Sequence, residues 1–77
     1  MSVSSITTLD TTYTVIVDEV SSIISYVGEA PVGSDESGAV WRIRKLETTG
    51  TLFKIKWANG NQHFNNIWND RASLTYI

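Results

Sequence analysis

Apolar and polar positions alternate along this chain, and no window shows the apolar stripe of an amphipathic helix. β-Branched and aromatic residues are frequent, as in strands. Two early runs, residues 12–17 and 21–27, read as strands, with a turn or bulge at 18–20 between them. In the first run Tyr13, Val15 and Val17 fall on one side. The pattern therefore predicts an all-β fold.

The clearest hairpin signal lies in residues 39–57. A three-residue loop at 48–50 gives Gly50 the left-handed conformation that such loops require. This loop sorts the two strands into an apolar face and a basic face, and a one-residue slip would mix them. The predicted apolar pairs are Trp41 with Trp57 and Ile43 with Ile55, and the predicted basic pairs are Arg42 with Lys56 and Arg44 with Lys54.

A second turn is predicted at Asn59 and Gly60, the two positions where a tight hairpin needs positive φ. Pairing outward from this turn gives a third strand and a meander. Phe64 then lies beside Ile55, and His63 beside Lys56.

The C-terminal residues supply a further turn at Asn69 and Asp70 and a last strand in which Leu74 and Tyr76 share a face. Aromatic side chains are expected to form most of the core, since each removes about 150–250 Å² from water. These are Trp41, Trp57, Phe64 and Trp68.

We expect residues 12–77 to form a single β domain, a small antiparallel barrel or two-layer sandwich of about five or six strands. An open barrel would leave an edge strand able to pair with a neighbouring chain. Residues 1–11 are mostly serine and threonine. They are expected to be an extended N-terminal arm that is ordered only when a neighbour captures it.

The length of 77 residues allows one small core, which supports only about 3–5 kcal/mol of stability. The chain has no cysteine, so no disulfide framework can add to it. The apolar runs are far shorter than a membrane span, and no basic leader opens the sequence. A soluble protein reinforced by assembly with other chains is the expectation.

Charge is distributed unevenly along the chain, although the formal net charge is only -2. Before Ala39 there are six acids and no lysine or arginine, a charge of -6. From Ala39 onward all six bases occur with only Glu47 and Asp70, a charge of +4. This polarity favours head-to-tail contacts, within the chain or between copies.

Candidate chemistry is sparse. His63 is the only imidazole, and the predicted register places it beside Lys56 and away from any acid that could orient it. Asp35 and Glu36 are adjacent, point apart on an extended chain and lie in a polar loop, so we read them as solvated. The glycine-containing segment 28–38 lacks the lysine and the helix of a phosphate loop. No catalytic residue, cofactor or metal site is therefore expected.

The predicted basic face is the main candidate for binding. Like charges on paired strands repel each other, so acidic groups are expected to bind there and neutralise them. The neutralising groups could belong to nucleic acid, to the acids of the chain's own first half, or to the acids of a neighbouring copy. We prefer the neighbouring copy. In that hypothesis Glu29, Asp35 and Glu36 dock on the Arg42 and Arg44 face of an adjacent subunit, and Arg71 makes a local contact with Asp70. The predicted interface residues are Glu29, Asp35, Glu36, Arg42, Arg44, Lys54, Lys56 and Arg71.

Two segments, "YVGEAPVGSDESGAVWRIRK" and "IKWANGNQHFNNIWNDRASLTY", resemble small structural proteins encoded among the head and tail genes of tailed bacteriophages. In that pattern "Y-x-G-x-A-x-x-G-S" leads into "W-x-I-x-[KR]", and the chain closes with "W-[DN]-[DN]-R-x-S-L-[ST]-Y". Asn69 stands where an acid is expected. The matching positions are Tyr26, Gly28, Ala30, Gly33, Ser34, Trp41, Ile43, Arg44, Trp57, Ala58, Gly60, Phe64, Trp68, Asp70, Arg71, Ser73, Leu74 and Tyr76.

The resemblance implies a non-enzymatic virion protein, assembled in the host cytoplasm in many copies on the head, connector or tail. Its implied partners are copies of itself and other virion proteins, with no membrane. The alternative is a single-stranded nucleic-acid-binding β module that uses a basic sheet face. In that case the residues that bind are Arg42, Arg44, Lys54, Lys56 and Arg71.

Overall fold

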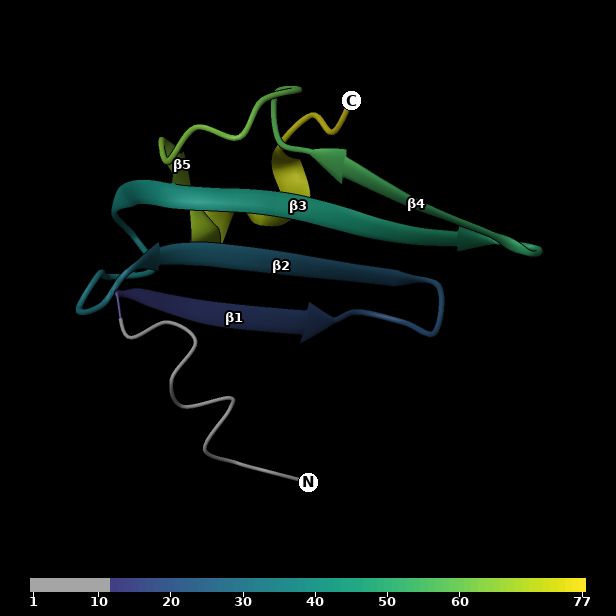
Figure 1. The fold of residues 1–77 in the computed structure, drawn as a ribbon, viewed down its shortest axis with the longest axis horizontal. Helices are drawn as coiled ribbons and strands as arrows, with labels where there is room; N and C mark the ends of the chain where they lie inside the picture. Colours follow the sequence, from purple (N-terminus) through teal and green to yellow (C-terminus); the bar gives the residue numbers. More distant parts are fainter. Residues whose placement is uncertain (1–11) are drawn as a thin grey trace.

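The computed structural model describes residues 12–77, so the arm predicted at 1–11 lies outside the described residues. The elements are β1 (Tyr13–Glu19), β2 (Ile24–Pro31), β3 (Ala39–Thr49), β4 (Leu52–Trp57), β5 (Asn66–Ile67) and the 3₁₀-helix η1 (Trp68–Ser73) (Figure 1). The predicted all-β class is confirmed. The strands form one open antiparallel sheet of five strands, in which β1-β2-β3-β4 are neighbours in that order and β5 pairs with β3. The predicted number of strands is confirmed, but the sheet is not closed, so the expected barrel is wrong.

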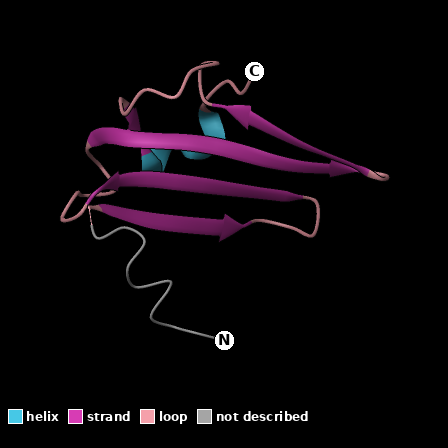
Figure 2. Cartoon of the chain, viewed as in Figure 1, coloured by secondary structure: helices cyan, strands magenta, loops and turns pink. Residues whose placement is uncertain are grey.

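β3 is the central strand of this sheet. Its residues 42–47 pair with β2 on one side. On the other side its residues 44–49 pair with β4, and its residues 39–41 pair with β5. η1 lies behind the sheet in the view of Figure 2. We call the side that carries η1 the covered face and the opposite side the open face.

The loop between β3 and β4 has two residues rather than three, and this difference changes the register. Thr49 pairs with Leu52, and Gly50 (φ 61°) is the only one of the two loop residues with positive φ, as in a type II′ turn. Arg44 therefore lies opposite Trp57 and Leu46 opposite Ile55. The register differs from the predicted one by three residues. Because this number is odd, the two faces of β4 are exchanged relative to β3.

The core lies on the covered face, where Trp41 and Trp68 are almost completely buried and their rings are 5.9 Å apart. The other fully or nearly buried apolar residues of this cluster are Tyr26, Ala30, Ile43 and Ala58. The prediction that Trp41 and Trp68 belong to the core is confirmed. Trp57 and Phe64 are only partly buried and lie outside the cluster, so that part of the predicted core is wrong.

Gly28 allows Trp68 to lie directly on the sheet. A Cβ atom at this position would be 2.5 Å from Cε3 of Trp68 and 3.2 Å from Cε3 of Trp41. Real Cβ atoms do not approach other atoms that closely, so any side chain at position 28 would displace the indole. The missing side chain is thus a requirement of the core.

The turn at Asn59 and Gly60 is confirmed, since their φ angles are 59° and 71°. The strand predicted after it is wrong, because residues 61–65 are irregular and pair with no part of β4. The chain returns instead as β5, where buried Asn66 accepts a hydrogen bond from the side chain of Asn59 at 3.0 Å.

The C-terminal residues also differ from the prediction. Asn69 and Asp70 belong to η1, and the expected last strand is reduced to a bridge between Ala58 and Tyr76. Ile77 donates its N–H to the carbonyl of Trp57. This segment therefore covers the outer edge of β4 at its end.

We predict that Gly28→Ala lowers the free energy of unfolding by about 1–3 kcal/mol, the usual effect of overpacking a core. Urea unfolding followed by tryptophan fluorescence measures this. The control is Gly38→Ala, whose Cβ would meet its nearest atom at an ordinary 3.4 Å. Equal stability of the two variants would contradict the requirement for glycine at position 28.

Candidate interaction surface

Alternate residues of the four long strands form the open face. Because paired residues point to the same side, the register places Val15 and Val17 of β1 on the side of Arg42 and Arg44, with Ile55 and Phe53 of β4. Their exposed fractions are 55% for Val15, 57% for Val17, 61% for Phe53 and 52% for Ile55. Apolar side chains are therefore left in water on both outer strands of this face.

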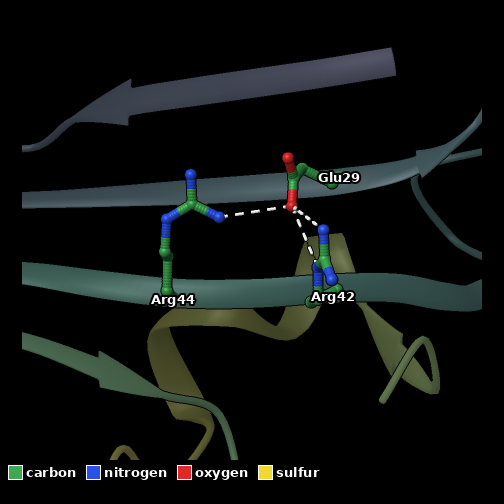
Figure 3. A network of polar contacts seen from close by, with 3 residues as sticks. All are labelled: Glu29, Arg42 and Arg44. Carbon is green, nitrogen blue, oxygen red and sulfur yellow. Dashed lines mark hydrogen bonds and ion pairs between the residues drawn. The ribbon is translucent and has the colours of Figure 1, made fainter. Parts of the chain in front are cut away.

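An ion cluster occupies the middle of the open face. Oε1 of Glu29 accepts hydrogen bonds from Nε and Nη2 of Arg42 at 2.9 and 2.6 Å, and from Nη1 of Arg44 at 3.2 Å (Figure 3). The three side chains are only 19–26% exposed. Charge-assisted bonds of this length are among the stronger ones in proteins. The cluster keeps one net positive charge.

Aromatic rings enclose the two guanidinium groups. Cζ of Arg42 is 4.6 Å from the ring centre of Phe64 and 5.8 Å from that of Trp57. Cζ of Arg44 is 5.3 Å from the ring centre of Trp57. Phe64 also stacks on Tyr13 at 5.5 Å, which links the 61–65 segment to β1 across the face. These contacts hold the arginines in fixed orientations.

The predicted basic quartet does not exist as one surface. Arg42 and Arg44 lie on the open face, whereas Lys54 and Lys56 lie on the covered face because of the changed register. Glu29 contacts Arg42 and Arg44 of its own chain, which is the own-chain cover that the sequence left as an alternative. The structure thus brings together three of the eight predicted interface residues.

The other acids of the predicted interface lie in the loop between β2 and β3. β2 extends to Pro31, so this loop comprises only residues 32–38. The side chains of Asp35 and Glu36 are exposed. The backbone carbonyl of Asp35 accepts a hydrogen bond from Nε1 of Trp41 at 2.8 Å. The backbone carbonyl of Glu36 accepts one from the N–H of Asn69 at 3.1 Å. The chain itself therefore fixes the backbone of the loop.

Arg71 also has a different partner from the predicted one. It forms an ion pair with Asp18 of β1 at 3.0 Å instead of a local contact with Asp70. Its Cζ lies 4.5 Å from the ring centre of Trp68. This residue therefore fastens η1 to the covered face of the outer strand β1.

A second ion cluster lies on the covered face, in the part of β3 that pairs with β4. Glu47 contacts Nζ of Lys45 and Nζ of Lys56, each at 3.1 Å. The hydrogen bond from Lys56, followed by the one from Lys45, lowers the pKa of Glu47 below its usual 4.5. The acid relieves the repulsion between the two lysines, which are directly paired across the strands.

The exposed apolar side chains of β4 and the partly exposed Trp57 and Phe64 were not expected on the surface. The alternation in "LFKIKW" separates the two sets of side chains on β4. It does not show which set lies on the same side of the sheet as Trp41. A glycine at the first position of a two-residue loop was the available signal for the correct register.

The motif positions quoted from the sequence lie on both faces of the sheet, since Arg44 and Trp57 are on the open face and others belong to the covered core. The buried cluster contains several residues of that motif, namely Tyr26, Ala30, Trp41, Ile43 and Trp68. These residues account for the packing of the covered face.

Comparison of the chain with models of protein families, with curated proteins and with solved structures finds no match. Among residues 12–77 there is no helix long and apolar enough to cross a bilayer. The same residues form no pocket.

We predict that Glu29→Gln destabilises the fold by about 1–3 kcal/mol, because two partly buried arginines lose their charged acceptor. Urea unfolding measures the change, and added salt should reduce the difference from the unsubstituted chain. Glu36→Gln is the matched control, since Glu36 is exposed and makes no ion pair within residues 12–77. Unaltered stability of Glu29→Gln would show that the cluster does not contribute to folding.

We predict that the carboxyl group of Glu47 titrates below pH 4.5 in a pH series of ¹³C NMR spectra. Lys56→Gln should raise this pKa more than Lys45→Gln, following the order of the two hydrogen bonds. Since the folded-state pKa is lowered, the contribution of Glu47 to stability is present above its unfolded pKa. It is lost as the pH falls through the folded-state value. A pKa unchanged by both substitutions would contradict this role.

Proposed function

We propose that this protein is a structural component of a tailed-phage virion, which acts by binding other protein chains and performs no chemistry. Two observations support the proposal: the resemblance of residues 26–45 and 55–76 to phage head and tail proteins, and the open face. The open face carries the proposal. A small sheet with its core on one side and apolar side chains in water on the other is typical of a protein that is completed by a partner.

The composition of the open face fits a protein partner. Arginine and large aromatic residues are enriched where protein interfaces derive most of their binding energy. Arg42, Trp57 and Phe64 supply these residue types in orientations fixed by the ion cluster. Less conformational entropy is lost on binding when side chains are already ordered.

Assembly also fits the small size of the domain. A chain of this length with one small core has a stability of only about 3–5 kcal/mol on its own. Anything that binds the folded state alone adds to that stability. Multiple copies in a virion would supply such contacts without a disulfide or a metal ion.

The nucleic-acid alternative rested on a continuous basic face, and that premise is wrong. Lys54 and Lys56 point away from Arg42 and Arg44. The two arginines already bind Glu29 and pack against aromatic rings. Binding of single strands by four clustered cations is therefore not the function that we propose.

The proposal predicts that the protein is present in intact particles. An antibody raised against the purified chain should label virions of the phage that encodes it, at one defined position on the head, connector or tail in electron micrographs. Particles of an unrelated phage serve as the control. Absence of the chain from purified virions would overturn the proposal. Strong salt-dependent binding of a fluorescent oligonucleotide would favour the alternative.

A further inference from the structure

The two outer strands of the sheet have unpaired edges within residues 12–77. In the described part of the chain, β1 pairs only with β2, and β4 pairs only with β3. The C-terminal segment covers the edge of β4 at Trp57 but leaves residues 52–56 open. Unpaired edges are sites where another strand can add to a sheet.

The ladder shows which backbone groups point outward. The N–H of Val32 binds the carbonyl of Thr12, so residues 14, 16 and 18 face β2 while Val15 and Val17 turn their N–H and C=O outward. On β4, the N–H of Ala58 binds the carbonyl of Ile43, so Phe53 and Ile55 turn theirs outward. Each edge thus presents donors and acceptors, from alternate residues, that are not bonded by other strands of residues 12–77.

Exposed apolar side chains are concentrated at the same two edges. Of the eleven large apolar residues that are exposed within residues 12–77, six lie on β1 and β4, three on each strand, while β2 has none and β3 has one. Those on the outer strands are Tyr13, Val15, Val17, Leu52, Phe53 and Ile55. The middle of the open face is occupied by charges instead. Stacking two open faces would bury these charges, whereas joining the edges would cover the apolar residues.

The charges of the two edges are complementary. β1 carries Asp18 and Glu19 and no base, whereas β4 carries Lys54 and Lys56 and no acid. Lys54 is exposed and makes no ion pair among the described residues. Pairing of two β1 edges would bring like charges together, and so would pairing of two β4 edges.

We infer that β1 of one copy adds to β4 of the next, so that the sheets of successive copies join into one continuous antiparallel sheet. This inference rests on the proposed multi-copy function and names its contact surface. Neighbouring strands of the sheet alternate in direction, so β4 and the β1 of a second copy in the same orientation are antiparallel. The open faces then lie on the same side, with the valines of β1 against Phe53 and Ile55. Such a head-to-tail contact leads to a ring or a helical filament.

Proline substitutions test this contact in the full-length chain. Val15→Pro and Ile55→Pro each remove an outward N–H that makes no bond within the sheet, so each blocks one edge. Sedimentation velocity should show that the unsubstituted chain forms assemblies larger than a dimer as concentration rises. Each variant alone should remain a monomer. An equimolar mixture should form a 1:1 dimer and nothing larger, because it retains one intact β1 edge and one intact β4 edge.

Lysine variants provide a second test should the proline variants fail to fold. Val15→Lys and Ile55→Lys should weaken assembly at least tenfold, whereas Val32→Lys, at a 63% exposed valine that belongs to neither β1 nor β4, should not change it.

Several results would overturn the inference. These are a monomeric unsubstituted chain at all concentrations, a single variant that assembles normally, and a mixture that stays monomeric. Assembly that appears only after deletion of residues 1–11 would show that the chain's own first residues occupy an edge. None of these results affects the labelling of virions, so the proposed function is tested separately.

Discussion

The packing of Trp68 against Gly28 and Trp41 is the contact on which the rest of the structure depends. It places η1, the only covering element among residues 12–77, on one side of the sheet, and the residues that lead to η1 pair with β3 as β5. The buried cluster around Trp41 and Trp68 is thereby confined to the covered face. The other face cannot be filled by this chain's described residues, so its arginines are neutralised by Glu29 and its apolar side chains remain in water.

The ion cluster on the open face separates two apolar regions. Without Glu29, Arg42 and Arg44, the valines of β1 and the aromatic residues of β4 would form one uninterrupted apolar surface. Such a surface binds many partners weakly and promotes aggregation. The charges in the middle of the open face make face-to-face association of two copies unfavourable. The ion clusters of both copies would lose their contact with water and gain no new partners. The arrangement therefore restricts how two copies can approach each other.

The sequence was sufficient for the features that depend on local chemistry. The all-β class followed from the alternation, and the Asn59–Gly60 turn followed from the two residue types that tolerate positive φ. The β3–β4 register was missed because "TTGT" permits a three-residue or a two-residue loop, and both bury Trp41. The charges distinguish the two registers. The observed register pairs Glu47 with Lys54, which attract, whereas the predicted register paired arginines with lysines, which repel.

Contacts between distant parts of the chain were beyond local patterns. Nothing near Phe64 in the sequence indicates that its ring stacks on Tyr13, and the partner of Arg71 lies 53 residues away at Asp18. For the candidate site, residue types alone indicated that Glu29, Arg42 and Arg44 were important. Whether the acid belonged to the same chain depended on the pairing of β2 with β3, which long-range packing decides.

The β3–β4 hairpin gives the sheet a stiff part and a compliant part. Near β5 both the core and η1 support β3, but towards Gly50 the hairpin extends past the end of β2 (Figure 1). Most side chains of β4 there are exposed. Cross-strand pairs hold it there with little support from the core, and segments with few buried contacts are expected to deform more easily than the rest of a fold. One folded unit could therefore adopt slightly different angles to its neighbours, as assemblies of differing curvature require.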